Sequence, residues 1–112
     1  MSAITTHVLD TSRGRPAADV KVELHKKSGE DWKSIGVGHT DATGRCNSLL
    51  GETLLAAGTY RLMFHAGAYF QALRLESFYS DIPVIFDVHD ATTHYHVPLL
   101  ISPFGYSTYR GS

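Results

Sequence analysis

Cysteine is almost absent from this chain of 112 residues, in which Cys46 is the single thiol. One cysteine cannot close a disulfide within the chain, and this fits a reducing compartment. Residues 1–7 lack the positively charged start and apolar run of a secretory signal. The carboxyl end is also not the Ser-Lys-Leu address of peroxisomes. We therefore expect a cytoplasmic protein.

An excess of charge of one sign is also missing. Lys and Arg number 10 and Asp and Glu number 11, which leaves a formal net charge of -1. Such a balance provides no broad basic face for a phosphate backbone or an anionic lipid surface. No apolar run approaches the roughly 20 residues that a membrane-spanning helix requires. The sequence therefore predicts neither nucleic acid nor membrane as a partner.

Common catalytic motifs are lacking as well. There is no Gly-x-Ser-x-Gly segment, so a serine nucleophile on a sharp turn is not indicated. There is also no Cys-x-x-Cys pair and no His-Glu-x-x-His helix, the usual frames of zinc sites. Any chemistry must come from a less standard arrangement of side chains.

What the sequence does contain is alternation of apolar and polar residues, which is typical of β-strands. In residues 20–25, Val20, Val22 and Leu24 alternate with Lys21, Glu23 and His25, which predicts one buried face and one wet face. Further strands are expected at 4–9, 32–40, 59–66, 82–89, 93–101 and 106–110. The whole chain, 1–112, is thus predicted to be one domain, an all-β sandwich of two sheets with about eight strands.

One short helix interrupts this pattern of strands. Residues 68–76 are rich in Ala, Gln, Leu, Arg and Glu, which are good helix formers, and their apolar positions suit a period of 3.6. Gly, Asp, Ser and Pro mark turns at 12–16, 27–31, 41–44 and 57–58.

Histidine is unusually frequent, with seven in the chain. His94 and His96 are two residues apart, so on a strand both rings project from the same face and could bind a metal. A zinc site is therefore an alternative hypothesis, with His7 or Asp87 as the third ligand. The remaining histidines are expected to be structural or exposed, because His25 falls on the wet face of its strand and the others lie in strands without a matching partner. These others are His39, His65 and His89.

The carboxyl-terminal segment, 94–112, is the most specific feature, and its last four residues are Tyr109, Arg110, Gly111 and Ser112. It resembles the terminal signature of the 5-hydroxyisourate hydrolases of the transthyretin-like family. Two more blocks are similar to that family, namely 6–17, which carries His7, and 40–45, which ends in Arg45. The resemblance extends from residue 7 to residue 112 and implies a transthyretin-like, or prealbumin-like, two-sheet sandwich.

The resemblance implies hydrolysis of 5-hydroxyisourate to 2-oxo-4-hydroxy-4-carboxy-5-ureidoimidazoline during urate degradation. His7, His96 and Arg45 are the implied catalytic residues. We expect His96 to be the base and His7 to position the water or donate the proton, although these roles could be exchanged. Arg45 is also expected to bind the substrate, together with Tyr109, Arg110 and Ser112. For Tyr109, simple packing is an equally good interpretation.

The resemblance also implies a homotetramer with sites in a channel between subunits, and no metal or organic cofactor. Transthyretin, a carrier of small ligands, has the same fold, so a carrier without catalysis is the alternative. Transthyretin has lysine, glutamate and threonine where this chain has His7, Arg45 and His96, and it lacks the Tyr-Arg-Gly-Ser ending. These differences favour the hydrolase.

Overall fold

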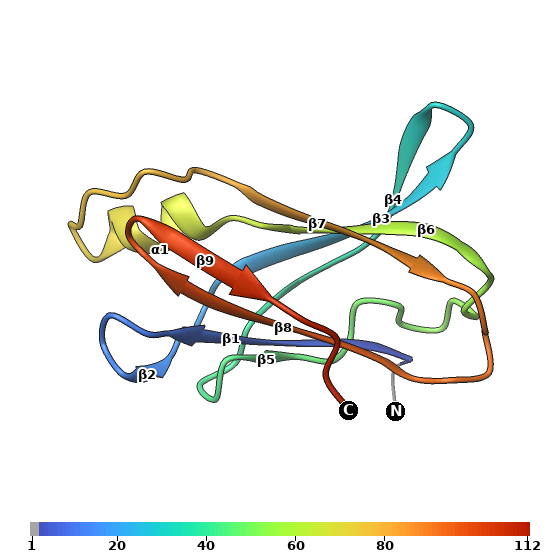
Figure 1. The fold of residues 1–112 in the computed structure, drawn as a ribbon, viewed down its shortest axis with the longest axis horizontal. Coiled ribbons are helices and arrows are strands. Elements are labelled where there is room, and N and C mark those ends of the chain that lie inside the picture. Colours follow the sequence, from blue (N-terminus) through green and yellow to red (C-terminus); the bar gives the residue numbers. More distant parts are fainter. Residues whose placement is uncertain (1–2) are drawn as a thin grey trace.

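A computed structural model describes residues 3–112, so residues 1 and 2 of the segment inspected for a signal lie outside it. Two β-sheets are layered against each other, and one short helix lies at one end (Figure 1). The first sheet has the order β2-β1-β8-β9, with β5 also paired to β1, and the second has the order β4-β3-β6-β7. The strands are β1 (Ile4–Asp10), β2 (Arg15–Pro16), β3 (Lys21–Ser28), β4 (Asp31–His39), β5 (Arg45–Cys46), β6 (Gly58–Phe64), β7 (Ile82–Val88), β8 (Tyr95–Ser102) and β9 (Gly105–Thr108). The predicted all-β, two-sheet sandwich is confirmed.

The core lies between the two sheets and follows the alternation of the strands. On β8, the side chains that belong to the buried core cluster are Tyr95, Val97, Leu99 and Ile101, which recur with period two. They belong to the same buried cluster as apolar residues of β3 and β6 in the other sheet. Each fully buried Val or Leu contributes about 1.5–3 kcal/mol to stability. This packing fixes which residues of β1 and β8 face away from the core.

The helix is shorter than predicted and begins earlier. The sequence pattern indicated 68–76, whereas helix α1 is Ala66–Ala72. Arg74 has φ 60°, in the left-handed region, and the Leu75 N–H turns back to the Phe70 carbonyl. Leu75 is exposed, so the apolar residues after 72 do not form a buried helical stripe.

Two very short strands were missed, and the ends of the longer strands shifted by up to three residues. β2 falls in the predicted turn at 12–16, and β5 directly follows the turn at 41–44. A two-residue strand has no alternation for a pattern to detect. The expected strand at 59–66 ends at Phe64, because the helix begins at Ala66.

The expectation that His25 lies on a wet face is wrong, because only 9% of it is exposed. Arg61 lies opposite it on β6 and donates an Nε–H to its Nδ1 at 3.0 Å. The same guanidinium lies over the Trp32 ring, 4.4 Å from the centroid. His25 is therefore on the outer face but covered by neighbouring side chains, and its structural role stands.

His65 also differs from the expectation, because it has partners. It follows β6, and its Nε2 pairs with a Glu23 carboxylate oxygen at 2.5 Å while its Nδ1 pairs with Asp81 at 3.1 Å. The pKa of Glu23 is lowered, chiefly by this hydrogen bond with His65. His65 thus joins β3 to the segment before β7.

Across residues 3–112, no helix is long and apolar enough to cross a membrane.

Candidate active site

Three of the predicted site residues meet on one face of the first sheet. His7 on β1 is the register partner of Arg45 on β5, and Thr5 on β1 is the partner of His96 on β8. Thr5 and His7 are two residues apart, so all of these side chains share the face that points away from the core. With usual strand spacings, the Cα atoms of His7 and His96 are about 8 Å apart on the diagonal.

The turn at 41–45 positions Arg45 on this face. The Asp41 carboxylate accepts backbone N–H groups from Thr43 and Arg45, at 2.9 and 3.1 Å, and the Thr43 hydroxyl at 2.6 Å. These bonds, led by that of the Thr43 hydroxyl, lower the pKa of Asp41. Gly44 has φ 82°, and a Cβ there would lie 2.4 Å from the Val8 carbonyl oxygen. Glycine is required for the turn to approach β1 this closely.

The same turn determines the tautomer of His7. Its Nε2 lies 2.8 Å from the carbonyl oxygen of Thr43. A carbonyl oxygen only accepts hydrogen bonds, so Nε2 carries the hydrogen. In the neutral ring, Nδ1 is then unprotonated and can accept a hydrogen from water or substrate.

His96 is half-buried, and its Nδ1 lies 2.8 Å from the Thr5 hydroxyl oxygen. Its pKa is lowered, first by desolvation and then by the charges of His94, Arg45 and His7, while a backbone hydrogen bond with Thr5 opposes the shift. A lowered pKa keeps the ring neutral at neutral pH. This is the form that a general base requires.

The chain terminus lies against His96. The N–H of Gly111 donates to the His96 carbonyl at 2.8 Å, and the two residues form a β-bridge. A Cβ at position 111 would lie 2.6 Å from Cδ2 of His96. Only glycine lets the tail run this close to the imidazole.

The other predicted tail residues are placed differently in the single chain. The Arg110 guanidinium stacks on the ring of Tyr95, 4.5 Å from its centroid. Tyr109 is 60% exposed, and Ser112 is exposed too. The structure thus brings His7, Arg45 and His96 together and leaves Tyr109, Arg110 and Ser112 at the margin.

Two polar residues beside His96 were not predicted as catalytic. Thr5 was treated only as part of a strand, and His94 only as a possible metal ligand. The Nε2 of His94 lies 3.0 Å from the Thr5 hydroxyl oxygen. The rings of His94 and His96 are stacked, with centroids 6.3 Å apart. The His-x-His spacing signals the pair, but nothing in the sequence signals that Thr5 lies between them.

The zinc hypothesis finds no third ligand. Within residues 3–112, no group of three or more His, Cys, Asp or Glu side chains is arranged to hold a metal. Asp87 belongs to β7 in the other sheet, where it accepts the Thr59 hydroxyl at 2.7 Å. His94 and His96 instead share the hydroxyl of Thr5.

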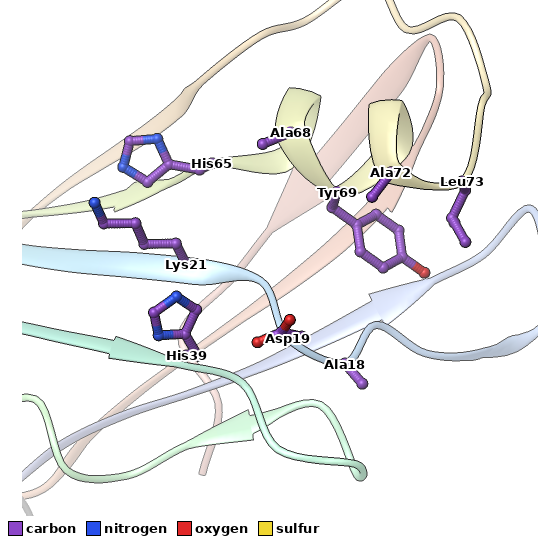
Figure 2. Close-up of a pocket in the computed structure, with 9 residues that line it drawn as sticks. All are labelled: Ala18, Asp19, Lys21, His39, His65, Ala68, Tyr69, Ala72 and Leu73. Carbon is purple, nitrogen blue, oxygen red and sulfur yellow. The ribbon is translucent and has the colours of Figure 1, made fainter.

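A cavity of about 360 Å³ lies elsewhere, between α1 and the ends of β3 and β4 (Figure 2). Its lining includes Lys21, His39 and His65, none of which was predicted as a site residue. Both ring nitrogens of His65 are already held by carboxylates. The Tyr69 hydroxyl, also in the lining, donates to Asp10 at 2.9 Å. None of the residues that line this cavity belongs to the cluster of His7, Arg45 and His96.

The fold and this polar face define a transthyretin-like sandwich with a histidine and arginine cluster. A sequence model described as the HIUase/Transthyretin family matches residues 4–111. The chain belongs to this family. It is 47% identical to a 5-hydroxyisourate hydrolase of Caulobacter vibrioides over 116 aligned residues that cover 100% of both chains.

Two solved structures show that the fold alone does not distinguish an enzyme from a ligand-binding protein. The Klebsiella pneumoniae 5-hydroxyisourate hydrolase matches with a TM-score of 0.88 and 37% identity, covering 100% of each chain. Sea bream transthyretin in complex with thyroxine matches with a TM-score of 0.91 and 34% identity, covering 97% of this chain and 94% of that one. Because an enzyme and a ligand-binding protein match almost equally well, the site residues must decide the function.

Proposed function

We propose that the chain is an enzyme that hydrolyses 5-hydroxyisourate to 2-oxo-4-hydroxy-4-carboxy-5-ureidoimidazoline in urate degradation. The observation that carries this proposal is the cluster of His7, Arg45 and His96 on one sheet face. Relatives named 5-hydroxyisourate hydrolase, such as that of Caulobacter vibrioides at 47% identity over the full chain, support it.

His96 acts as the general base in this proposal. Its Nδ1 is tied to Thr5, so Nε2 is the nitrogen that takes a proton from the attacking water. The same proton then passes to the ring nitrogen that leaves when the C–N bond breaks. Such proton transfer typically accelerates a reaction 10²–10⁴-fold. His7 orients the water through its unprotonated Nδ1, which follows from its bond to Thr43.

Arg45 binds the substrate and stabilises the transition state. Its planar guanidinium can donate two parallel hydrogen bonds to the oxygens of a flat, urate-like molecule. Negative charge develops on the carbonyl oxygen that water attacks, and a fixed cation stabilises it more than the neutral ground state. The position of Arg45 opposite His7 supports both roles.

The remaining substrate contacts come from the tail and from neighbouring subunits. The tail residues Tyr109, Arg110 and Ser112 are supported as substrate-binding groups by the β-bridge that holds Gly111 against His96. An open sheet face cannot enclose a ligand, so the site requires a second surface. We propose a cytoplasmic homotetramer whose subunits meet at this face.

Exposed strand edges also support a homotetramer. In the described part of the chain, β7 pairs only with β6 and β9 only with β8, so each is an edge strand. Ile85 on β7 is 60% exposed, and Tyr106 on β9 is 42% exposed. Apolar side chains on free strand edges favour pairing with another chain. Light scattering of the purified protein should therefore give four times the mass of one chain.

A carrier of small ligands is the second candidate, because the thyroxine-bound sea bream transthyretin has the same fold. The charged and titratable groups of this face favour the enzyme. Protein treated with a chelator should accelerate the decay of freshly generated 5-hydroxyisourate, followed by ultraviolet absorbance. Decay at the buffer rate, together with tight thyroxine binding in calorimetry, would show that the carrier is the correct interpretation.

A further inference from the structure

The hydroxyl of Thr5 lies between two imidazole nitrogens. Its oxygen is 2.8 Å from Nδ1 of His96 and 3.0 Å from Nε2 of His94. Thr5 is only 5% exposed, so water has little access to compete for these bonds. The three side chains form a short chain of hydrogen bonds, which we call the Thr5 relay: His94, Thr5 and His96.

A hydroxyl carries one hydrogen, and when it donates this hydrogen to one of two neutral rings and accepts one from the other, the relay has two arrangements. Either the hydroxyl donates to His94 and accepts from Nδ1–H of His96, or it donates to His96 and accepts from Nε2–H of His94. In the first arrangement, Nε2 of His96 is unprotonated. In the second, Nε2 of His96 carries the hydrogen and cannot act as a base.

The surroundings of His96 favour the first arrangement for catalysis. Nδ1 of His96 is committed to the Thr5 hydroxyl, whose oxygen lies 2.8 Å away. Nε2 is therefore the nitrogen available to a water molecule on the open face. It has to be unprotonated before the reaction begins.

We propose that His94 is a positioning residue that acts through the Thr5 hydroxyl to hold His96 in the tautomer with an unprotonated Nε2. This inference rests on the proposed hydrolase function. His94 accepts the hydrogen of Thr5 and need not touch the substrate. Thr5 in turn accepts Nδ1–H of His96, and a hydrogen bond of this kind commonly fixes the tautomer and orientation of a functional histidine ring.

The relay stays unchanged through the proton transfers. Nε2 of His96 takes a proton from water as the oxygen attacks the carbonyl carbon, and the ring becomes an imidazolium. Nδ1–H continues to donate to Thr5, which continues to donate to His94. Nε2 then gives its proton to the leaving ring nitrogen, so no hydrogen of the relay has to move. This preorganisation avoids rearrangement during the reaction.

Replacement of the hydroxyl tests the relay most directly. T5V keeps the shape of the side chain but removes the hydrogen bonds, so kcat should fall about tenfold or more while KM changes less than about twofold. T5S retains a hydroxyl and should restore most of kcat. T6V is the matched control, because the Thr6 hydroxyl donates to the Val97 carbonyl on the inward face. It should leave kcat per folded molecule unchanged.

A second pair of variants changes the length of the side chain at position 94. The amide of H94Q can accept the Thr5 hydrogen near the position of Nε2, whereas the shorter side chain of H94N cannot. H94Q should therefore retain more of kcat than H94N. Because both residues act through one hydroxyl, the T5V/H94N double variant should lose no more than T5V alone. Additive losses would contradict the relay.

The tautomer itself can be read without substrate from the ¹⁵N shifts of the His96 ring. The wild type should show a protonated Nδ1 and an unprotonated Nε2, and T5V and H94N should shift this pattern towards Nε2–H. An unchanged pattern in both variants, or a wild type with Nε2–H, would overturn the proposal. A wild type with the expected pattern but no hydrolysis would instead overturn the proposed function and leave the relay intact.

Discussion

Replacement of Gly111 by Ala tests whether the tail is a working part of the site. The new Cβ would lie 2.6 Å from Cδ2 and 3.4 Å from Cγ of His96, and 3.2 Å from Cγ of Pro98. Carbon atoms in contact prefer about 3.5–4.0 Å, so the imidazole or the tail must move by about 1 Å. Misplacement of a catalytic group by this distance can cost about 10²-fold in rate. We expect G111A to lower kcat between about tenfold and a hundredfold.

Stability should respond much less than rate. Gly111 is joined to the sheet by a single isolated bridge near the end of the chain, so its loss should cost no more than about 1 kcal/mol. G105A is the matched control, because its Cβ would meet only the Ser102 hydroxyl at an ordinary 3.7 Å. Steady-state kinetics and thermal unfolding of both variants measure the two effects. A G111A enzyme with wild-type kcat would refute the reasoning.

Other predictions concern the base, the tail and acid stability. H96N should lower kcat at least about a hundredfold without unfolding the protein, as circular dichroism can check. Because the pKa of His96 is lowered, kcat/KM should rise with pH through a midpoint below 6.5; a midpoint above 6.5 would contradict this assignment. Deletion of residues 109–112 should abolish most activity while the melting temperature changes little. Normal turnover by the truncated protein would show that the tail is not needed for catalysis. Because the pKa of Glu23 is lowered in the folded protein, its interactions stabilise the fold above the ordinary pKa of 4.5, and this stabilisation is lost as the pH falls. The free energy of unfolding of E23Q, measured by denaturant titration, should therefore decrease less in acid than that of the wild type.

The fold was largely predictable because alternation along a strand is a local property. Residues 20–25 indicate a strand with one buried face, and the structure extends it to Lys21–Ser28. The failures occurred where local pattern is weak or misleading. β5 is too short to show a period, and the apolar residues after Ala72 follow a helical spacing but lie exposed. His25 was misjudged because its cover comes from Arg61 on another strand.

The site was only partly predictable, because its geometry depends on pairings between distant segments. His7, Arg45 and His96 were found through their motifs. Thr5 was not found, because its place beside His96 results from the parallel pairing of β1 with β8, across about 90 residues of sequence. Arg110 was predicted next to the substrate, yet in the single chain its guanidinium lies on Tyr95. No sequence pattern specifies this side-chain orientation.

The decay of freshly generated 5-hydroxyisourate tests the central claim most directly, when it is measured with chelator-treated wild type beside the H7N/H96N double variant. The account predicts that the wild type accelerates the decay in proportion to its concentration and that the double variant loses nearly all of this acceleration. Decay at the buffer rate with the wild type, or equal acceleration by the double variant, would contradict it.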